Sequence, residues 1–325
     1  MELLVYASVT FAALVFSLNG YLIKNAKAFF AIWYTVYIWL VLTVRNEFDV
    51  DINTYADAML STSLSFYYIK EPVIWLGQRY LYQYTQDTFS VFVIYDAIVG
   101  IILYHALRNF KAPQYAFFSI LIFFPFILGM QNIYRQWVAS IIFLCCFSYV
   151  WNQRHPFLTY VLFVVSVLAH NSAAIFLPLL LVRKRRPANK IFWILSFAVS
   201  FFGIYLGAET KSDTSTGANL SAAYLGLLLF IVCAIVLLDK GVFRKDRLIE
   251  YKTLISLFSL ALFATYILRG SGSERVSMFC LLVAYPILVN LFEVRFRQKF
   301  PVRAAYTALG FAPMFMFSVS AFILE

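Results

Sequence analysis

The chain has 325 residues, of which 62% are hydrophobic and 13% are charged. This composition excludes a soluble globular protein and is typical of a polytopic helical membrane protein. The formal net charge of +10 would suit a nucleic-acid partner, but the basic residues are distributed as membrane topology demands, so we expect no nucleic acid to bind.

Apolar segments of membrane-crossing length recur along the whole chain. A long polar connection covers residues 45–87, and a small polar loop covers residues 208–219. Within 45–87, the aromatic-rich segments 53–68 and 72–85 are predicted to be short helices at the membrane interface. In chain order, we predict single spans at 3–22, 28–44, 88–107, 113–130, 134–151, 189–207, 220–238, 253–269, 276–292 and 303–323.

The stretch 156–186 decides the predicted topology. It is apolar for most of its length, breaks at His170, and has basic residues at both ends. Since cytoplasmic loops carry the Lys and Arg excess, both ends favour the cytoplasm. We predict two short helices, 157–169 and 171–182, each of about 12 residues or roughly 18 Å, against a hydrocarbon core of about 30 Å. His170 would then lie at the floor of a cavity open to the outside. The alternative is one long tilted helix with a polar kink.

The positive-inside rule supports this split pair. With it, 19 of the 26 Lys and Arg residues fall on the cytoplasmic side. If the pair were a single span, every later loop would change sides, and the excess of Lys and Arg on the cytoplasmic side would be lost. We therefore predict that residues 1–325 form a single all-α integral-membrane domain with about 12 crossing helices. Short interfacial helices outside the membrane complete it.

Five arginines fall at span edges on the predicted outer side, where positive residues are disfavoured. A planar, permanently charged guanidinium is the usual partner of phosphate oxygens, so we expect some of these arginines to bind phosphate. The alternative for any one of them is to reach lipid headgroups or to pair with local acids. The five are Arg45, Arg79, Arg135, Arg269 and Arg275.

Several acids share the predicted outer side with His170. A carboxylate or an imidazole in a partly dry cavity can act as a general base near neutral pH. Asp57 and Asp87 are expected to be solvated loop residues, and mid-span Asp96 must find a partner. No P-loop, GxGxxG motif or His/Cys cluster occurs, so neither a metal nor a cofactor is expected. The acids that could act as a base are Glu47, Asp49, Asp51 and Glu71.

Five short motifs carry much of the polar character of this side. They are Arg45 followed by Asp51-Ile-Asn-Thr-Tyr55, then Glu71-Pro72, Asn132-Ile-Tyr-Arg135-Gln136-Trp-Val-Ala139, Ala169-His170-Asn-Ser and Arg275-Val-Ser. In order and spacing, these motifs resemble the EpsG family of bacterial exopolysaccharide and O-antigen polymerases (Wzy-type). The resemblance runs over most of the chain, and its most specific pieces are N-x-x-R-Q-x-x-A and A-H-x-S.

The resemblance implies a GT-C-like, metal-independent glycosyltransferase in the bacterial inner membrane, with its active site facing the periplasm. The enzyme would transfer a glycan from undecaprenyl diphosphate to the non-reducing end of another lipid-diphosphate-linked repeat unit. Its expected partners are these donor and acceptor oligosaccharides, the lipid bilayer and a chain-length regulator protein.

The candidate site residues fall into three sets. The catalytic set is His170, Glu71 and Asp51; the diphosphate-binding set is Arg135, Arg275, Arg45 and Arg269; the substrate-binding set is Tyr55, Asn132, Gln136 and Arg79. His170 is either the general base or a cationic hydrogen-bond donor to the leaving diphosphate, with Glu71 or Asp51 as the base in the second case. Three other functions remain open: an O-antigen ligase, a polysaccharide flippase or other transporter, and a membrane O-acyltransferase.

Overall fold

The computed structural model describes residues 2–45, 50–61, 66–182, 190–210, 221–238, 248–268, 271–295 and 299–311. All regular secondary structure in these residues is helical. Five helical stretches are long and apolar enough to cross a membrane: Ala26–Arg45, Thr88–Asn109, Gln114–Asn132, Lys190–Gly207 and Gly272–Val294. Shorter apolar helices accompany them, among them Pro156–Ala169 and Asn171–Leu180. The prediction of an all-α polytopic membrane protein is confirmed, and the number of crossings stays a prediction.

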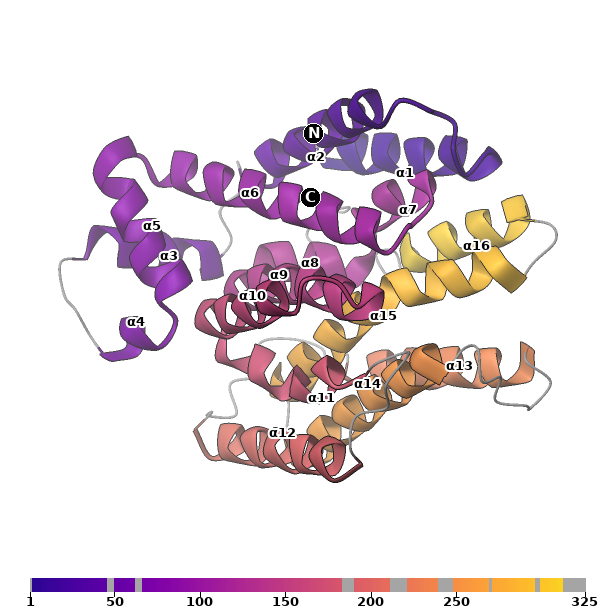
Figure 1. The fold of residues 1–325 in the computed structure, drawn as a ribbon. Helices are drawn as coiled ribbons and strands as arrows, with labels where there is room; N and C mark the ends of the chain where they lie inside the picture. The colour runs from indigo at the N-terminus through magenta and orange to yellow at the C-terminus, as the bar shows by residue number, and fades with distance from the viewer. Residues whose placement is uncertain are drawn as a thin grey trace.

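The helices follow one another along the chain with short connections (Figure 1). They are α1 (Glu2–Leu18), α2 (Ala26–Arg45), α3 (Val50–Leu60), α4 (Phe66–Lys70), α5 (Pro72–Thr85), α6 (Thr88–Asn109), α7 (Gln114–Ser119), α8 (Phe124–Asn132), α9 (Tyr134–Asn152), α10 (Pro156–Ala169), the 3-10 helix η1 (Asn171–Phe176), α11 (Leu177–Leu180), α12 (Lys190–Thr210), α13 (Ser221–Leu238), α14 (Leu248–Ile267), α15 (Ser271–Arg295) and α16 (Lys299–Phe311).

Helix α9 lies at the centre of the fold. It contacts α6, α8, α10 and α15, and its side chains are buried around its whole circumference. A helix that is apolar on every side is stable only when other helices surround it. The first turn of α9, which carries Arg135 and Gln136, is therefore held by the best-packed part of the protein.

The three helices of the polar connection gather at one end of the long helices (Figure 1). The predicted 72–85 helix is α5, which begins at Pro72, where a missing N–H costs nothing. Tyr95 of α6 donates its hydroxyl to the Val73 carbonyl at 2.7 Å, and a side chain at Gly77 would collide with the same hydroxyl. Glycine thus allows the close approach that fixes α5 on α6. The predicted 53–68 helix is present as α3 and α4, with 62–65 outside the described residues.

The predicted break at His170 is confirmed. Helix α10 ends at Ala169, His170 is extended with φ −159° and ψ 128°, and η1 begins at Asn171. The second half is a 3-10 turn followed by the single turn of α11, rather than the regular helix expected over 171–182. Pro178 explains part of this irregularity because it has no N–H to donate within a helix. Figure 1 shows α11 between α10 and α12.

The predicted 113–130 span corresponds to the helical stretch Gln114–Asn132, within which α7 and α8 follow one another and Pro125 lies in the first turn of α8. Two other predicted boundaries were wrong. The span predicted from 276 begins at Ser271, so Arg275 lies on helix α15 and not in a loop. Glycines suggested a loop there, but serine and an acidic first-turn residue, Glu274, also favour a helix start. Finally, α12 continues to Thr210, and residues 211–219 of the predicted 208–219 loop lie outside the described residues.

Candidate active site at one end of the helices

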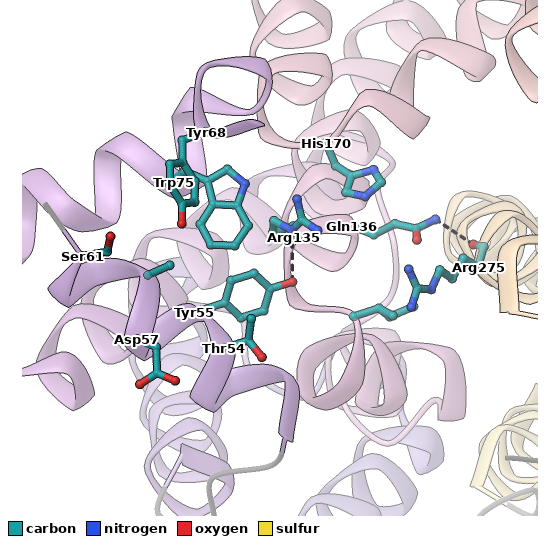
Figure 2. A pocket seen from close by; sticks show the side chains of 12 residues that line it. Thr54, Tyr55, Asp57, Ser61, Tyr68, Trp75, Arg135, Gln136, His170 and Arg275 are labelled. Atoms are coloured by element: carbon teal, nitrogen blue, oxygen red, sulfur yellow. Dashed lines mark hydrogen bonds between the residues drawn. The ribbon is translucent and has the colours of Figure 1, made fainter. Parts of the chain in front are cut away.

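A cavity of about 420 Å³ opens where α3, α4 and α5 meet the N-terminal ends of α9 and α15 (Figure 2). Its walls combine aromatic rings, hydroxyl groups and three groups that are cationic or can become so. The lining residues are Thr54, Tyr55, Asp57, Ala58, Ser61, Tyr68, Trp75, Ile133, Arg135, Gln136, His170 and Arg275.

Helix α3 supplies a polar face to this cavity. Thr54, Asp57 and Ser61 recur at spacings of three and four residues, so they share one side of the helix. Tyr55 stands beside them, and its ring lies 5.1 Å from that of Trp75 on α5. The Asp57 carboxylate is exposed at the rim, and within the described residues it has no hydrogen-bond or ion-pair partner.

Arg135 is held from three directions. Its Nη1 donates to Glu71 Oε2, its Nε donates to the Tyr55 hydroxyl at 3.1 Å, and its guanidinium lies 4.8 Å from the centre of a Trp75 ring. Only a planar guanidinium can make a forked set of hydrogen bonds while stacking on an aromatic face. The position of this positive charge is therefore set before any ligand binds.

Glu71 connects three elements but does not line the cavity. Besides Arg135 of α9, its carboxylate accepts the backbone N–H of Asn171 at 3.3 Å, at the start of η1. Its Oε1 also lies 3.8 Å from Nε2 of His170. The side chain of Glu71 is only 7% exposed. The catalytic role of Glu71 stays a prediction; the structure places its carboxylate in contact with Arg135 and 3.8 Å from His170, but not among the residues that line the cavity.

The hydrogen bonds of His170 indicate which nitrogen of its imidazole carries the proton. Nδ1 accepts the backbone N–H of Ser172 at 3.1 Å and lies 2.8 Å from the Ser172 hydroxyl. A backbone N–H can only donate, so Nδ1 is the unprotonated nitrogen and the ring proton is on Nε2. His170 therefore presents an N–H donor, not a lone pair, on the side where Glu71 lies.

Arg275 enters the cavity from the opposite wall (Figure 2). Gln136 donates its Nε2 to the Arg275 carbonyl at 2.9 Å, which ties the first turn of α9 to the N-terminal end of α15. In the described part of the chain, the guanidinium of Arg275 has no hydrogen-bond or ion-pair partner. Of the two arginines in this cavity, Arg275 is the one that remains available to a ligand.

The electrostatics of the cavity favour an anion. Arg135 lies in the first turn of α9 and Arg275 directly follows the first turn of α15, and the N-termini of such long helices already carry partial positive charge. Helix α9 has no side-chain cap at its N-terminus, so its first N–H groups are not satisfied by a capping side chain. An arginine at such a position is unfavourable without a nearby negative group; Glu71 supplies one for Arg135, whereas the Arg275 guanidinium has none paired with it in the described part of the chain. The arrangement can hold a polyanion such as a diphosphate.

Four predicted site residues that the structure describes are not in the lining. Arg45 is buried in an ion pair with Asp96, Arg79 donates to the Ala58 carbonyl at 2.8 Å, and Asn132 ends α8 one residue before the lining residue Ile133. Glu71 is the fourth. Arg269 lies outside the described residues, as do Glu47, Asp49 and the side chain of Asp51. In the described ranges, no three His, Cys, Asp or Glu side chains gather as metal ligands would.

Sequence reasoning missed several lining residues. Trp75 and Tyr68 were interpreted only as aromatic residues of an interfacial segment, and Asp57 as a solvated loop acid. The three-and-four-residue spacing of Thr54, Asp57 and Ser61 around Tyr55 was the available signal, since it places them along one helix face.

The fold and cavity together define a class of protein: a polytopic membrane protein with an arginine-containing, aromatic-walled cavity at one end of its helices. The model of the EpsG family matches residues 27–323, so the chain belongs to the EpsG family. The match confirms the family that the sequence motifs indicated. The family includes Wzy-type polymerases, so membership suggests a polysaccharide polymerase-like function. No curated protein and no solved structure matches the chain.

Proposed function

We propose that this protein is a bacterial inner-membrane polysaccharide polymerase. It transfers a glycan from undecaprenyl diphosphate to the non-reducing end of another lipid-diphosphate-linked repeat unit, in a cavity facing the periplasm. One observation carries the proposal: two arginines from separate helix N-termini converge on one cavity, one fixed by Glu71 and the other unpartnered in the described chain.

The arginines suit the leaving group of this reaction. When the bond between the sugar and the lipid diphosphate breaks, negative charge grows on the diphosphate. Preorganised positive groups stabilise that charge without reorganising during the reaction. Arg135 is already oriented by Glu71 and Tyr55, and Arg275 is available to contact a second phosphate oxygen. His170 lines the same cavity, and its Nε2 proton, which lies on the side of Glu71, would have to turn toward the leaving group to donate a hydrogen bond to it.

A carboxylate of α3 would accept the proton from the attacking sugar hydroxyl as the new bond to the anomeric carbon forms. Asp57 is the acid that lines the cavity among the described residues, and the predicted Asp51 lies in the first turn of the same helix. Glu71 is less suited to this step because it stands behind the lining and already accepts hydrogen bonds from Arg135 and Asn171. Replacing each α3 aspartate singly by asparagine identifies the base, since asparagine cannot take the proton.

The opposite wall suits a sugar. The rings of Tyr55, Tyr68 and Trp75 offer flat apolar faces, and the hydroxyls of Thr54 and Ser61 can exchange hydrogen bonds with a glycan. On the adjoining helix α5, the exposed rings of Tyr80 and Tyr84 suit the level of the lipid headgroups. A donor could therefore keep its lipid tail in the bilayer while its sugar enters the cavity.

The deciding experiment uses purified protein in lipid nanodiscs with lipid-diphosphate-linked repeat units extracted from cells that lack the gene. A ladder of glycans spaced by one repeat unit is the expected product, and Arg135→Ala should fail to make it. Transfer to lipid A alone would indicate a ligase. Unchanged repeat units would contradict the proposed function.

A further inference from the structure

A buried ion pair lies outside the cavity and joins α2 to α6. Arg45 Nε lies 2.7 Å from Asp96 Oδ2, and the two side chains are 1% and 0% exposed. We infer that Arg45 and Asp96 are positioning residues, which fix the corner between α8 and α9 and thereby the place of Arg135. The inference rests on the proposed function only for the role of Arg135.

Arg45 contacts both sides of that corner. Its Nη2 donates to the Met130 carbonyl at 2.9 Å, near the end of α8, and its guanidinium lies 4.8 Å from the ring centre of Tyr134, the first residue of α9. One rigid, planar group therefore contacts the chain on both sides of Ile133, the residue that separates α8 from α9. Asp96 holds that group from the α6 side.

The corner transmits this restraint directly to the cavity. Ile133, the residue between the two helices, has φ −139° and ψ 53° and lines the cavity. Tyr134 is followed immediately by Arg135, and its ring centre lies 5.9 Å from that of Tyr55. Since Tyr55 accepts a hydrogen bond from Arg135, a shift of Tyr134 would disturb both the backbone and a side-chain partner of Arg135.

The pair is poorly arranged for stability alone. Within the described residues, Asp96 Oδ1 and the Tyr134 hydroxyl are both buried without a hydrogen bond that meets the usual geometry. Removing two charges from water is repaid only when the remaining polar atoms are satisfied. Apolar side chains of similar volume can therefore replace such a pair with little loss of stability. That replacement would instead lose the contacts that fix the corner between α8 and α9.

The central test is the double variant Arg45→Met with Asp96→Leu. We expect a melting temperature equal to or above that of the wild type, together with faster amide hydrogen exchange at residues 131–136. Inhibition of polymerisation by inorganic pyrophosphate should weaken, and kcat/KM should fall on the order of 10- to 100-fold, as expected when a reactive group is misplaced by about 1 Å.

A charge swap separates positioning from neutralisation. Arg45→Asp with Asp96→Arg keeps opposite charges but removes the donor to the Met130 carbonyl from α2. We expect the swapped protein to fold and to remain impaired. Full recovery of kcat/KM in the swap would overturn the inference, as would wild-type exchange and kinetics in the Met/Leu variant.

The matched control is the bidentate pair of Arg303 and Glu293, with contacts of 2.6 and 2.7 Å between α16 and α15. Arg303→Met with Glu293→Leu should leave exchange at 131–136 and pyrophosphate inhibition unchanged. Hydrogen exchange does not depend on activity, so the outcomes are distinguishable. If the wild type neither polymerises nor responds to pyrophosphate, the proposed function fails. Even then, amide hydrogen exchange at residues 131–136 shows whether the Arg45–Asp96 pair fixes the corner between α8 and α9.

Discussion

Arg275 provides the sharpest test of the cavity, because its guanidinium has no hydrogen-bond or ion-pair partner in the described chain. Arg275→Ala removes no side-chain hydrogen bond to the described residues, and the bond from Gln136 to its backbone carbonyl remains. We therefore expect the free energy of unfolding to change by no more than about 0.5 kcal/mol. Loss of a charge-assisted contact to the diphosphate should cost about 1.5–3 kcal/mol in transition-state binding. That corresponds to a roughly 10- to 150-fold lower kcat/KM.

Arg135 should behave differently because it is already paired. Arg135→Ala leaves the nearly buried Glu71 carboxylate without its partner, which should cost about 3–5 kcal/mol of stability in addition to activity. Arg135→Lys keeps the charge but cannot contact Glu71 and Tyr55 together while stacking on Trp75, so it should also be impaired. The contrast between a stable Arg275 variant and an unstable Arg135 variant follows from the partners of each side chain.

The assay combines thermal unfolding of purified protein with initial rates on lipid-linked repeat units at several donor concentrations. Arg108→Ala is the matched control, since Arg108 is an exposed arginine near the far end of α6. Wild-type kcat/KM in Arg275→Ala at matched amounts of folded protein would refute a role for Arg275 in diphosphate binding. If the Arg275 and Arg135 variants lose equal amounts of stability, the argument that Arg135 is held by folded-state partners and Arg275 is not would be refuted.

Three other predictions test the rest of the structure. His170→Gln keeps an N–H donor but cannot act as a base, so we expect reduced but measurable polymerisation, whereas His170→Ala should lose most of it; equal, wild-type rates in both variants would remove His170 from the site. At Gly100 an added methyl group would overlap the ring of Tyr37, so Gly100→Ala should lower the free energy of unfolding by about 1–3 kcal/mol, measured by thermal unfolding. For topology, a cysteine placed at Lys70 should react with an impermeant thiol reagent in intact spheroplasts, and one at Arg108 should not; the reverse pattern would invert the proposed orientation.

Much of the fold could be predicted because its signals are local. Apolar runs and their flanking charges mark α2, α6 and α9, and Pro72 marks the start of α5. The break at His170 followed from basic residues at both ends of one apolar stretch. Each of these signals depends on neighbouring residues in the chain, so no knowledge of the tertiary structure was needed.

The candidate site could be predicted only in part. The motifs around Tyr55, Glu71, Arg135, His170 and Arg275 indicated that these residues act together, and the structure places all but Glu71 in the lining of one cavity. Their different roles could not be seen in the sequence. Glu71 and Asn171 are 100 residues apart in the chain, and only the packing of α5 against α10 brings the Glu71 carboxylate to the backbone of Asn171.

Arg45 shows most clearly where sequence reasoning ended. By itself, the sequence placed an arginine at the outer edge of a span, and that position suits a phosphate ligand as well as an ion pair. Its partner Asp96 lies 51 residues further along the chain, in the middle of another helix. Hydrophobic periodicity determines which segments become helices, because it is read along one segment at a time. Which charges meet inside the protein depends on how those helices pack, and only the tertiary structure decided that Arg45 is buried beside Asp96 and that Arg275 faces the cavity.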